Sequence, residues 1–246
     1  MAVPTPSTLP GRAMCTTRSF GILAATIGCL AFAGIARAHG VAESDQAFIE
    51  GATGINIAPY MYLGAKHMVT GYDHLLFLAG VVFFLYRMKD VGIYVTLFAI
   101  GHSLTLLVGT IFDIRANPYI VDAIIGLSVA YKAIDNLDGF TTMFGKRPDP
   151  KAAVLIFGLF HGFGLATKLQ DLTLSQDGLI PNLLAFNVGV ELGQLLALAI
   201  ILIAMNLWRF SPSFQRSAIF ANAALMCAGF ILVGYQLTGY FTSQGV

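Results

Sequence analysis

The chain has 246 residues, of which 57% are hydrophobic and only 11% are charged, and its formal net charge is +1. Soluble domains carry roughly 25% charged residues, and a nearly neutral chain lacks the basic face that nucleic acid requires. Abundant apolar residues at low net charge also argue against a disordered chain. The composition therefore predicts an all-α integral membrane protein with no nucleic-acid partner.

The first 38 residues have the pattern of a signal peptide. Two arginines precede an apolar run over residues 20–35, and the small-residue sequence Ala-Arg-Ala follows it at residues 36–38. Cleavage there would make His39 the mature N-terminus. The run is also about as long as the ~17 residues that minimally span a bilayer, so an uncleaved anchor is the alternative. We expect residues 39–58 to form a short exported tail rather than a second domain.

Hydropathy divides the remaining domain, residues 59–246, into a bundle of six predicted transmembrane helices. Each is close to the ~20 residues needed to cross a bilayer. The loops after the first, third and fifth spans contain seven basic residues, whereas the opposite side contains three. By the positive-inside rule the first set faces the cytoplasm and both ends of the mature chain lie outside it. The predicted spans are residues 60–86, 91–112, 119–136, 151–167, 181–207 and 217–241.

The first span contains the sequence His67-Met-Val-Thr-Gly-Tyr-Asp73-His74. In a straight helix the two histidines would stand about 10.5 Å apart along the axis, too far for both to bind one ion. Either they are two stations on a path, or Gly71 breaks the helix and the segment folds around one site. We favour the break, because non-helical backbone is tolerated at membrane depth where it lines a wet cavity. Asp73 is a metal ligand in this interpretation and a helix N-cap in the alternative.

Three more ionisable residues lie about ten residues into later spans: His102 in the second, His161 in the fourth and Glu191 in the fifth. At 1.5 Å per residue they share a depth of about 15 Å. A charged group there costs at least ~2.5 kcal/mol on insertion scales, which makes it a functional candidate. We expect the second and fifth spans to pack beside the fourth and to gather the three residues into an interior cluster. The structural alternative is a hydrogen bond from each histidine to a neighbouring group.

Polar side chains also recur along the fifth span. Asn187, Glu191 and Gln194 stand at i, i+4 and i+7, on one stripe of a helix that must face protein or water. Asp122 lies near the outer end of the third span, where solvation is the ordinary expectation. We take Asn187, Gln194 and Asp122 as supporting polar residues of a metal site.

The fourth span has a small-xxx-small pattern, Gly158-Leu-Phe-His161-Gly162, that allows a neighbouring helix to approach closely.

Imidazole and carboxylate ligands suit nickel, zinc, cobalt or iron(II), and the three scattered cysteines argue against a copper(I) site. Ser128 with His161 superficially resembles a serine protease pair, but the motif is short and we expect no enzyme.

Four motifs occur in order along the chain, and with them it resembles the HupE/UreJ family of small membrane proteins. The resemblance implies an exported six-span protein of the prokaryotic inner membrane, associated with hydrogenase and urease accessory systems. It implies that His67, Asp73 and His74 are metal-entry residues and that His161 belongs to a second signature. The motifs are His67-x5-Asp73-His74-Leu-Leu-Phe-Leu, Gly-His102-Ser-Leu-Thr, Phe-His161-Gly-Phe-Gly and Phe-Asn187-Val-Gly-Val-Glu191-Leu-Gly-Gln194.

The nickel branch of this family is regarded as metal permeases, and its second signature contains another His and a Glu. This chain has Leu165 and Lys168 there, so the resemblance is closer to the broader branch. We expect a secondary permease for a divalent transition metal ion, nickel first and cobalt, zinc or iron next. Its partners are the metal ion, the lipid bilayer and a metalloenzyme maturation system, and no organic cofactor is expected. The alternative is a non-transporting accessory protein for metalloenzyme assembly.

Overall fold

The computed structural model describes residues 43–171 and 177–244, and every regular element in these two ranges is an α-helix. The all-α prediction is confirmed for this part of the chain. The predicted signal segment and His39 lie outside the described residues. The helices are α2 (Glu43–Gly51), α3 (Ile57–Thr70), α4 (Tyr72–Val82), α5 (Met88–Ile111), α6 (Pro118–Asn136), α7 (Gly139–Phe144), α8 (Pro150–Gln170), α9 (Leu179–Arg209) and α10 (Phe214–Gln244).

The later five predicted spans each correspond to one helix, namely α5, α6, α8, α9 and α10, with ends within three residues of the prediction. Among the described helices, α5, α8, α9 and α10 are long and apolar enough to cross a membrane. The first predicted span is instead two shorter helices, α3 and α4.

The helix break at Gly71 is confirmed. The backbone of Gly71 is extended (φ −72°, ψ 100°), although its N–H still bonds the carbonyl of His67 and its own carbonyl accepts from Leu75. A Cβ at this position would lie 2.9 Å from Nδ1 of His74 and 3.1 Å from the oxygen of His67. A glycine is therefore needed where the chain changes direction beside the two histidines.

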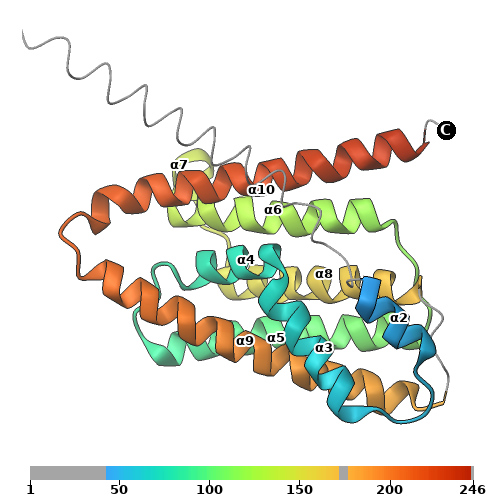
Figure 1. Cartoon of the computed structure of the whole chain (residues 1–246). Coiled ribbons are helices and arrows are strands. Elements are labelled where there is room, and N and C mark those ends of the chain that lie inside the picture. Colours follow the sequence, from blue (N-terminus) through green and yellow to red (C-terminus); the bar gives the residue numbers. More distant parts are fainter. Residues whose placement is uncertain (1–42, 172–176, 245–246) are drawn as a thin grey trace, which may run out of the picture.

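The bundle is built from three closely packed helix pairs: α5 with α8, α3 with α9, and α6 with α10 (Figure 1). Glycines make the close approach possible, since a Cβ on Gly162 would overlap the carbonyl of His102, and one on Gly189 would overlap that of Met61. The small-xxx-small prediction for α8 is confirmed. The expectation that the fifth span packs beside the fourth is wrong, because the glycine face of α9 fits α3 instead.

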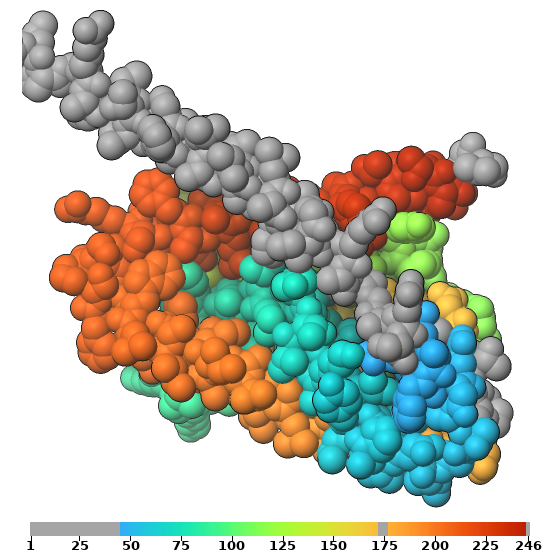
Figure 2. Space-filling view, in the orientation of Figure 1, coloured from blue at the N-terminus to red at the C-terminus, as the bar shows by residue number. Residues whose placement is uncertain are grey.

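The segment expected as an exported tail contains α2, which packs on the bundle. Ile49 is only 1% exposed, and Asp45 forms an ion pair of 2.8 Å with Lys66 of α3. Figure 2 shows the blue residues of α2 against the cyan surface of α3.

One end of the bundle gathers the turns between α4 and α5, between α6 and α8, and between α9 and α10 (Figure 1). Arg209, at the end of α9, donates to the carbonyls of Val82 and Phe83 at the end of α4. We call this end the α7 end, and it contains the basic loops identified in the sequence.

Candidate metal centre

Four histidines from four helices converge in the middle of the bundle: His67 of α3, His74 of α4, His102 of α5 and His161 of α8. The ring centroid of His74 lies 5.2 Å from that of His67, 5.8 Å from His102 and 4.9 Å from His161. Ligand nitrogens of His67, His74 and His102 all lie within 4.8 Å of one another. We call these four residues the histidine cluster. The outer and mid-membrane histidines, which we had expected in separate groups, therefore form one group.

The cluster is buried, with one more accessible member. His74, His102 and His161 are at most 2% exposed, whereas His67 is partly buried. A ligand approaching from the surface therefore meets His67 first.

His74 is oriented by its neighbour Asp73. The buried Asp73 carboxylate lies 3.0 Å from Nδ1 of His74, and a carboxylate oxygen accepts this bond when the ring nitrogen carries the proton. The lone pair of the neutral ring is then on Nε2, the arrangement typical of carboxylate-supported metal ligands. The N-cap alternative is wrong, because Gly71 is the N-cap of α4 and no side chain caps it. Asp73 holds His74 in this geometry and is not one of the three grouped ligand residues.

His161 is fixed in the same way by its own helix. Its Nδ1 donates to the carbonyl oxygen of Phe157 at 2.7 Å, which again leaves the lone pair of a neutral ring on Nε2. Phe98 and Phe77 pack on the ring at centroid distances of 5.1 and 5.3 Å. Phe77, Phe98 and Phe157 were not predicted as part of the site. The spacing offered a signal for two of them, because Phe98 and Phe157 stand one helical turn before His102 and His161.

His102 is the most informative member of the cluster. It is fully buried, and within the described residues neither of its ring nitrogens has a hydrogen-bond partner. The structural alternative of a carbonyl partner is therefore wrong for the described part of the chain. The backbone around it is held by Gly162 and by Thr105, whose hydroxyl donates to the Leu159 carbonyl at 2.6 Å. A buried polar group without a partner costs roughly 1–3 kcal/mol, which is recovered when a ligand engages it.

Glu191 does not join the cluster. It is exposed on the outer face of α9, as is its neighbour Leu192, so the predicted interior group with His102 and His161 is wrong. At 100° per residue, Asn187 and Gln194 stand only ~20° apart around the helix, while Glu191 stands ~40° to one side of Asn187. The contact with α3 covers the side of α9 that carries Asn187 and Gln194, and it leaves the side that carries Glu191 outside.

The two amides of the stripe are buried as expected. Asn187 donates to the carbonyl of Leu183 one turn earlier in α9, and Gln194 donates across to the carbonyl of Val95 in α5 at 3.4 Å. Their observed contacts are to the backbone.

Asp122 is buried rather than solvated, which corrects our expectation. Lys168 of α8 lies 3.0 Å from its carboxylate, and the Gln236 amide of α10 donates to it at 3.4 Å. The carboxylate is therefore committed to an interhelical ion pair with Lys168. The serine protease alternative also finds no support in these contacts, because the Ser128 hydroxyl donates to the Ile125 carbonyl of its own helix.

A small apolar cavity of about 10 Å³ lies between His74, Val81 and Tyr94. This volume is about the space that one water molecule needs. Phe77, Val81, Tyr94 and Phe98 are among the residues that line it, and we call it the neck.

Comparison with protein families matches residues 43–244 to the family described as HupE / UreJ protein. Comparisons with curated proteins and with solved structures give no significant match. The family match extends over all nine described helices and includes the four histidines and Asp73. The chain therefore belongs to the HupE/UreJ family.

Proposed function

We propose that the protein is a membrane permease for a divalent transition metal ion and that the histidine cluster binds the ion during passage. The observation that carries the proposal is the convergence of His67, His74 and His102, with ligand nitrogens within 4.8 Å of one another. The family is associated with nickel or cobalt transport and with metalloenzyme maturation. Neutral imidazole nitrogen binds nickel, cobalt, zinc and iron(II) well, and we place nickel first.

The spacing of the cluster suits an ion that must also leave. Four tetrahedral ligands at ~2.1 Å from a metal ion lie about 3.4 Å from one another, so the three rings need small rotations to close on an ion. A permease binds its cargo only tightly enough to select it. A cluster whose ligand nitrogens are near one another, but farther apart than in a closed tetrahedral site, meets this requirement. His161, 4.9 Å from His74 between ring centroids, is the fourth ligand in this proposal.

The proposal includes six transmembrane passages in the prokaryotic inner membrane, with the broken pair α3–α4 as the first and α6 as the third. The α7 end then faces the cytoplasm, because its loops contain the basic excess that the positive-inside rule assigns to that side. Both ends of the mature chain lie on the opposite side.

Uptake by the purified protein in sealed lipid vesicles tests the proposal. Vesicles containing the wild type should accumulate one or more of Ni²⁺, Co²⁺, Zn²⁺ and Fe²⁺ above empty vesicles. His74→Ala should abolish accumulation at equal protein content, since it removes the central ligand. Leu76→Ala, which truncates an apolar side chain two residues further along α4, should retain it.

The same experiment separates the permease from an accessory protein. Metal binding by the purified protein without uptake for any ion in the panel would favour a role in metalloenzyme maturation. Unchanged uptake in His74→Ala would contradict the assignment of the cargo site.

A further inference from the structure

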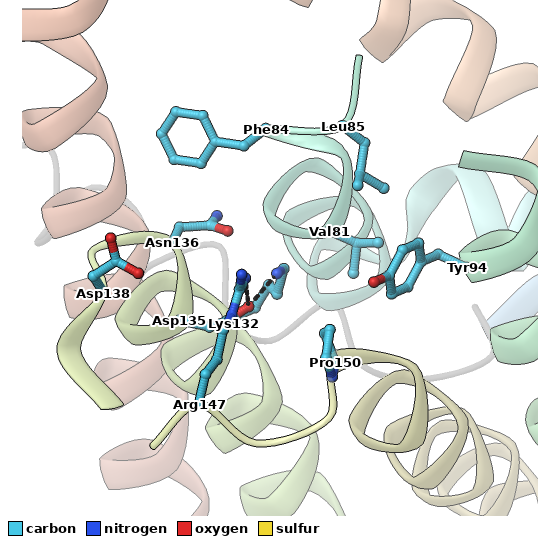
Figure 3. A pocket seen from close by; sticks show the side chains of 10 residues that line it. All are labelled: Val81, Phe84, Leu85, Tyr94, Lys132, Asp135, Asn136, Asp138, Arg147 and Pro150. Atoms are coloured by element: carbon cyan, nitrogen blue, oxygen red, sulfur yellow. Dashed lines mark hydrogen bonds and ion pairs between the residues drawn. The ribbon is translucent and has the colours of Figure 1, made fainter. Parts of the chain in front are cut away.

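A second cavity, of about 380 Å³, lies at the α7 end of the bundle. It is formed by the end of α4, the beginning of α5, the end of α6 and the loop before α8 (Figure 3). Pockets for small molecules commonly begin at roughly 300 Å³, so this cavity has room for a small organic ligand. The residues that concern the argument are Val81, Tyr94, Lys132, Asp135, Asp138 and Arg147.

Two cations in this cavity converge on one carboxylate. The Lys132 ammonium lies 2.5 Å from Asp135, and Arg147 donates to both oxygens of the same carboxylate at 2.6 and 2.9 Å. The Lys132 side chain is 10% exposed and that of Asp135 is 2% exposed, whereas Arg147 is half exposed at the cavity opening. Hydrogen bonding to Asp135 also raises the pKa of the Arg147 guanidinium above its ordinary value, so the group remains charged.

The hydrogen-bonding capacity left in the cavity consists mainly of donors. A lysine has three N–H donors and an arginine has five. Within the described residues, Lys132 uses one of them and Arg147 uses two, all on Asp135. Three of the roughly four acceptor positions of that carboxylate are thereby occupied.

The other polar residues that line the cavity do not change this excess of donors over acceptors. Figure 3 shows the Tyr94 hydroxyl pointing into the cavity, where it can donate. The Asn136 amide is already directed to Gly80 and Asn222. The other lining carboxylate, Asp138, is exposed and lies across the cavity from Tyr94. A ligand that reaches Lys132 and Arg147 from the cavity therefore meets unused N–H groups.

We propose that this cavity binds an oxyanion, a molecule with carboxylate or phosphate groups, through the remaining N–H groups of Lys132 and Arg147. Charge-assisted bonds from arginine and lysine to such groups are among the strongest hydrogen bonds in proteins. The anion comes from solution as a small polycarboxylate or phosphate, or from the headgroup of an anionic lipid. Both sources have the same recognising chemistry.

The position of the cavity relates the oxyanion to the metal route. Val81 and Tyr94 line both the cavity and the neck that begins at His74. Tyr94 stands eight residues before His102 in α5, which corresponds to ~12 Å along the helix. A polycarboxylate bound there would be placed to chelate an ion that leaves the histidine cluster through the neck.

Binding measured without metal tests the proposal independently of transport. Citrate and inorganic pyrophosphate are titrated into the purified protein in neutral detergent and followed by calorimetry. Arg147→Gln should weaken binding by at least about tenfold, since it removes a charged donor. Lys146→Gln, which removes the adjacent basic residue that does not line the cavity, should bind as the wild type does. Failure of both anions to bind would leave the metal proposal intact.

The direction in which Asp135→Asn changes anion affinity distinguishes an anion site from a cation site. Removing the internal carboxylate releases donors of Lys132 and Arg147 and should tighten anion binding severalfold, whereas a cation site would be lost. Weaker anion binding in Asp135→Asn, with its melting temperature within a few degrees of the wild type, would overturn the proposal. If Asp135→Asn does not fold, Arg147→Lys replaces it, and equal anion binding by Arg147→Lys and Arg147→Gln would also overturn the proposal.

The lipid source is tested in nanodiscs with and without phosphatidylglycerol. Retention of this lipid by wild type but not by Arg147→Gln, with no citrate or pyrophosphate binding, would assign the site to a headgroup. Absence of all three ligands from the wild-type protein would overturn the proposal.

Discussion

The histidine cluster and the cavity at the α7 end both bury polar side chains from several helices, yet the two regions offer opposite hydrogen-bonding groups to a ligand. In the cluster, Nδ1 of His74 and of His161 bonds an oxygen, so the lone pair of each neutral ring is on Nε2. In the cavity, Lys132 and Arg147 have more N–H donors than Asp135 can accept. In each region the charge of the expected ligand follows from the donors or acceptors that face it rather than from local net charge.

The two regions also differ in what holds them. The cluster is fixed by backbone contacts at Gly71 and at Gly162, which leave no space for a Cβ. The cavity is held by flexible cationic side chains, one of them on the loop before α8 and half exposed. The cluster is therefore the more rigid of the two, and substitutions there should have the larger effects.

The largest effect is expected from Gly162→Ala. Its Cβ would overlap the carbonyl of His102, so α5 and α8 must separate. We expect a loss of stability at or above the roughly 1–3 kcal/mol typical of overpacked cores, together with loss of metal binding. Thermal unfolding in detergent measures it, with Gly234→Ala, which meets nothing within 4 Å, as the control. Equal melting temperatures for the two variants would contradict the close helix contact.

His102→Leu should separate binding from stability. It removes a fully buried imidazole that has no hydrogen-bond partner within the described residues and replaces it with an apolar side chain. We expect metal binding to be lost, while the metal-free melting temperature stays equal to or rises above that of the wild type, because a buried unmatched polar group costs roughly 1–3 kcal/mol. A melting temperature that falls with retained metal binding would assign His102 a packing role.

Asp73→Asn tests whether the Asp73 carboxylate strengthens His74 as a metal ligand. The carboxylate orients His74 through Nδ1, and loss of such a partner typically weakens metal affinity about 10–100-fold. Calorimetric titration with Ni²⁺ measures the change, and Asp73→Glu provides a variant that keeps the charge. Affinity within twofold of the wild type in Asp73→Asn would mean that the carboxylate does not tune the ligand.

Much of the fold could be predicted from the sequence, because apolar runs and glycine patterns are local signals. The break at Gly71 followed from the spacing of two histidines that a continuous helix could not bring to one ion. Which helices pair did not follow, since the fit between Gly189 of α9 and Met61 of α3 depends on two surfaces far apart in the sequence.

The four histidines and Asp73 of the candidate site could be predicted, whereas the positions of the carboxylates of Glu191 and Asp122 could not. A histidine within an apolar span has few roles other than that of a ligand or a hydrogen-bonding group. The side of α9 on which the Glu191 carboxylate lies depends on an angle of ~40°, which a pattern of i, i+4 and i+7 does not resolve. Asp122 was likewise expected in solvent because its partner Lys168 is 46 residues away. The cavity at the α7 end was missed because its four charged residues, Lys132, Asp135, Asp138 and Arg147, come from the end of a span and the loops that follow it, where charges are ordinary.

The smallest effect is expected from Glu191→Gln, although this residue lies within one of the family-like motifs. Glu191 is exposed on α9, flanked by Val188 at 49% and Leu192 at 51% exposure, and its carboxylate is not among the grouped ligand residues. Neutralising it removes a charge from an apolar outer face without altering the histidine cluster, so the metal dissociation constant should stay within about twofold of the wild type, a change below roughly 0.4 kcal/mol. Calorimetric titration with Ni²⁺ beside Asp73→Asn measures the difference. A tenfold loss in Glu191→Gln would show that the outer face of α9 turns inward when the ion binds, and the cluster of four histidines would then be incomplete.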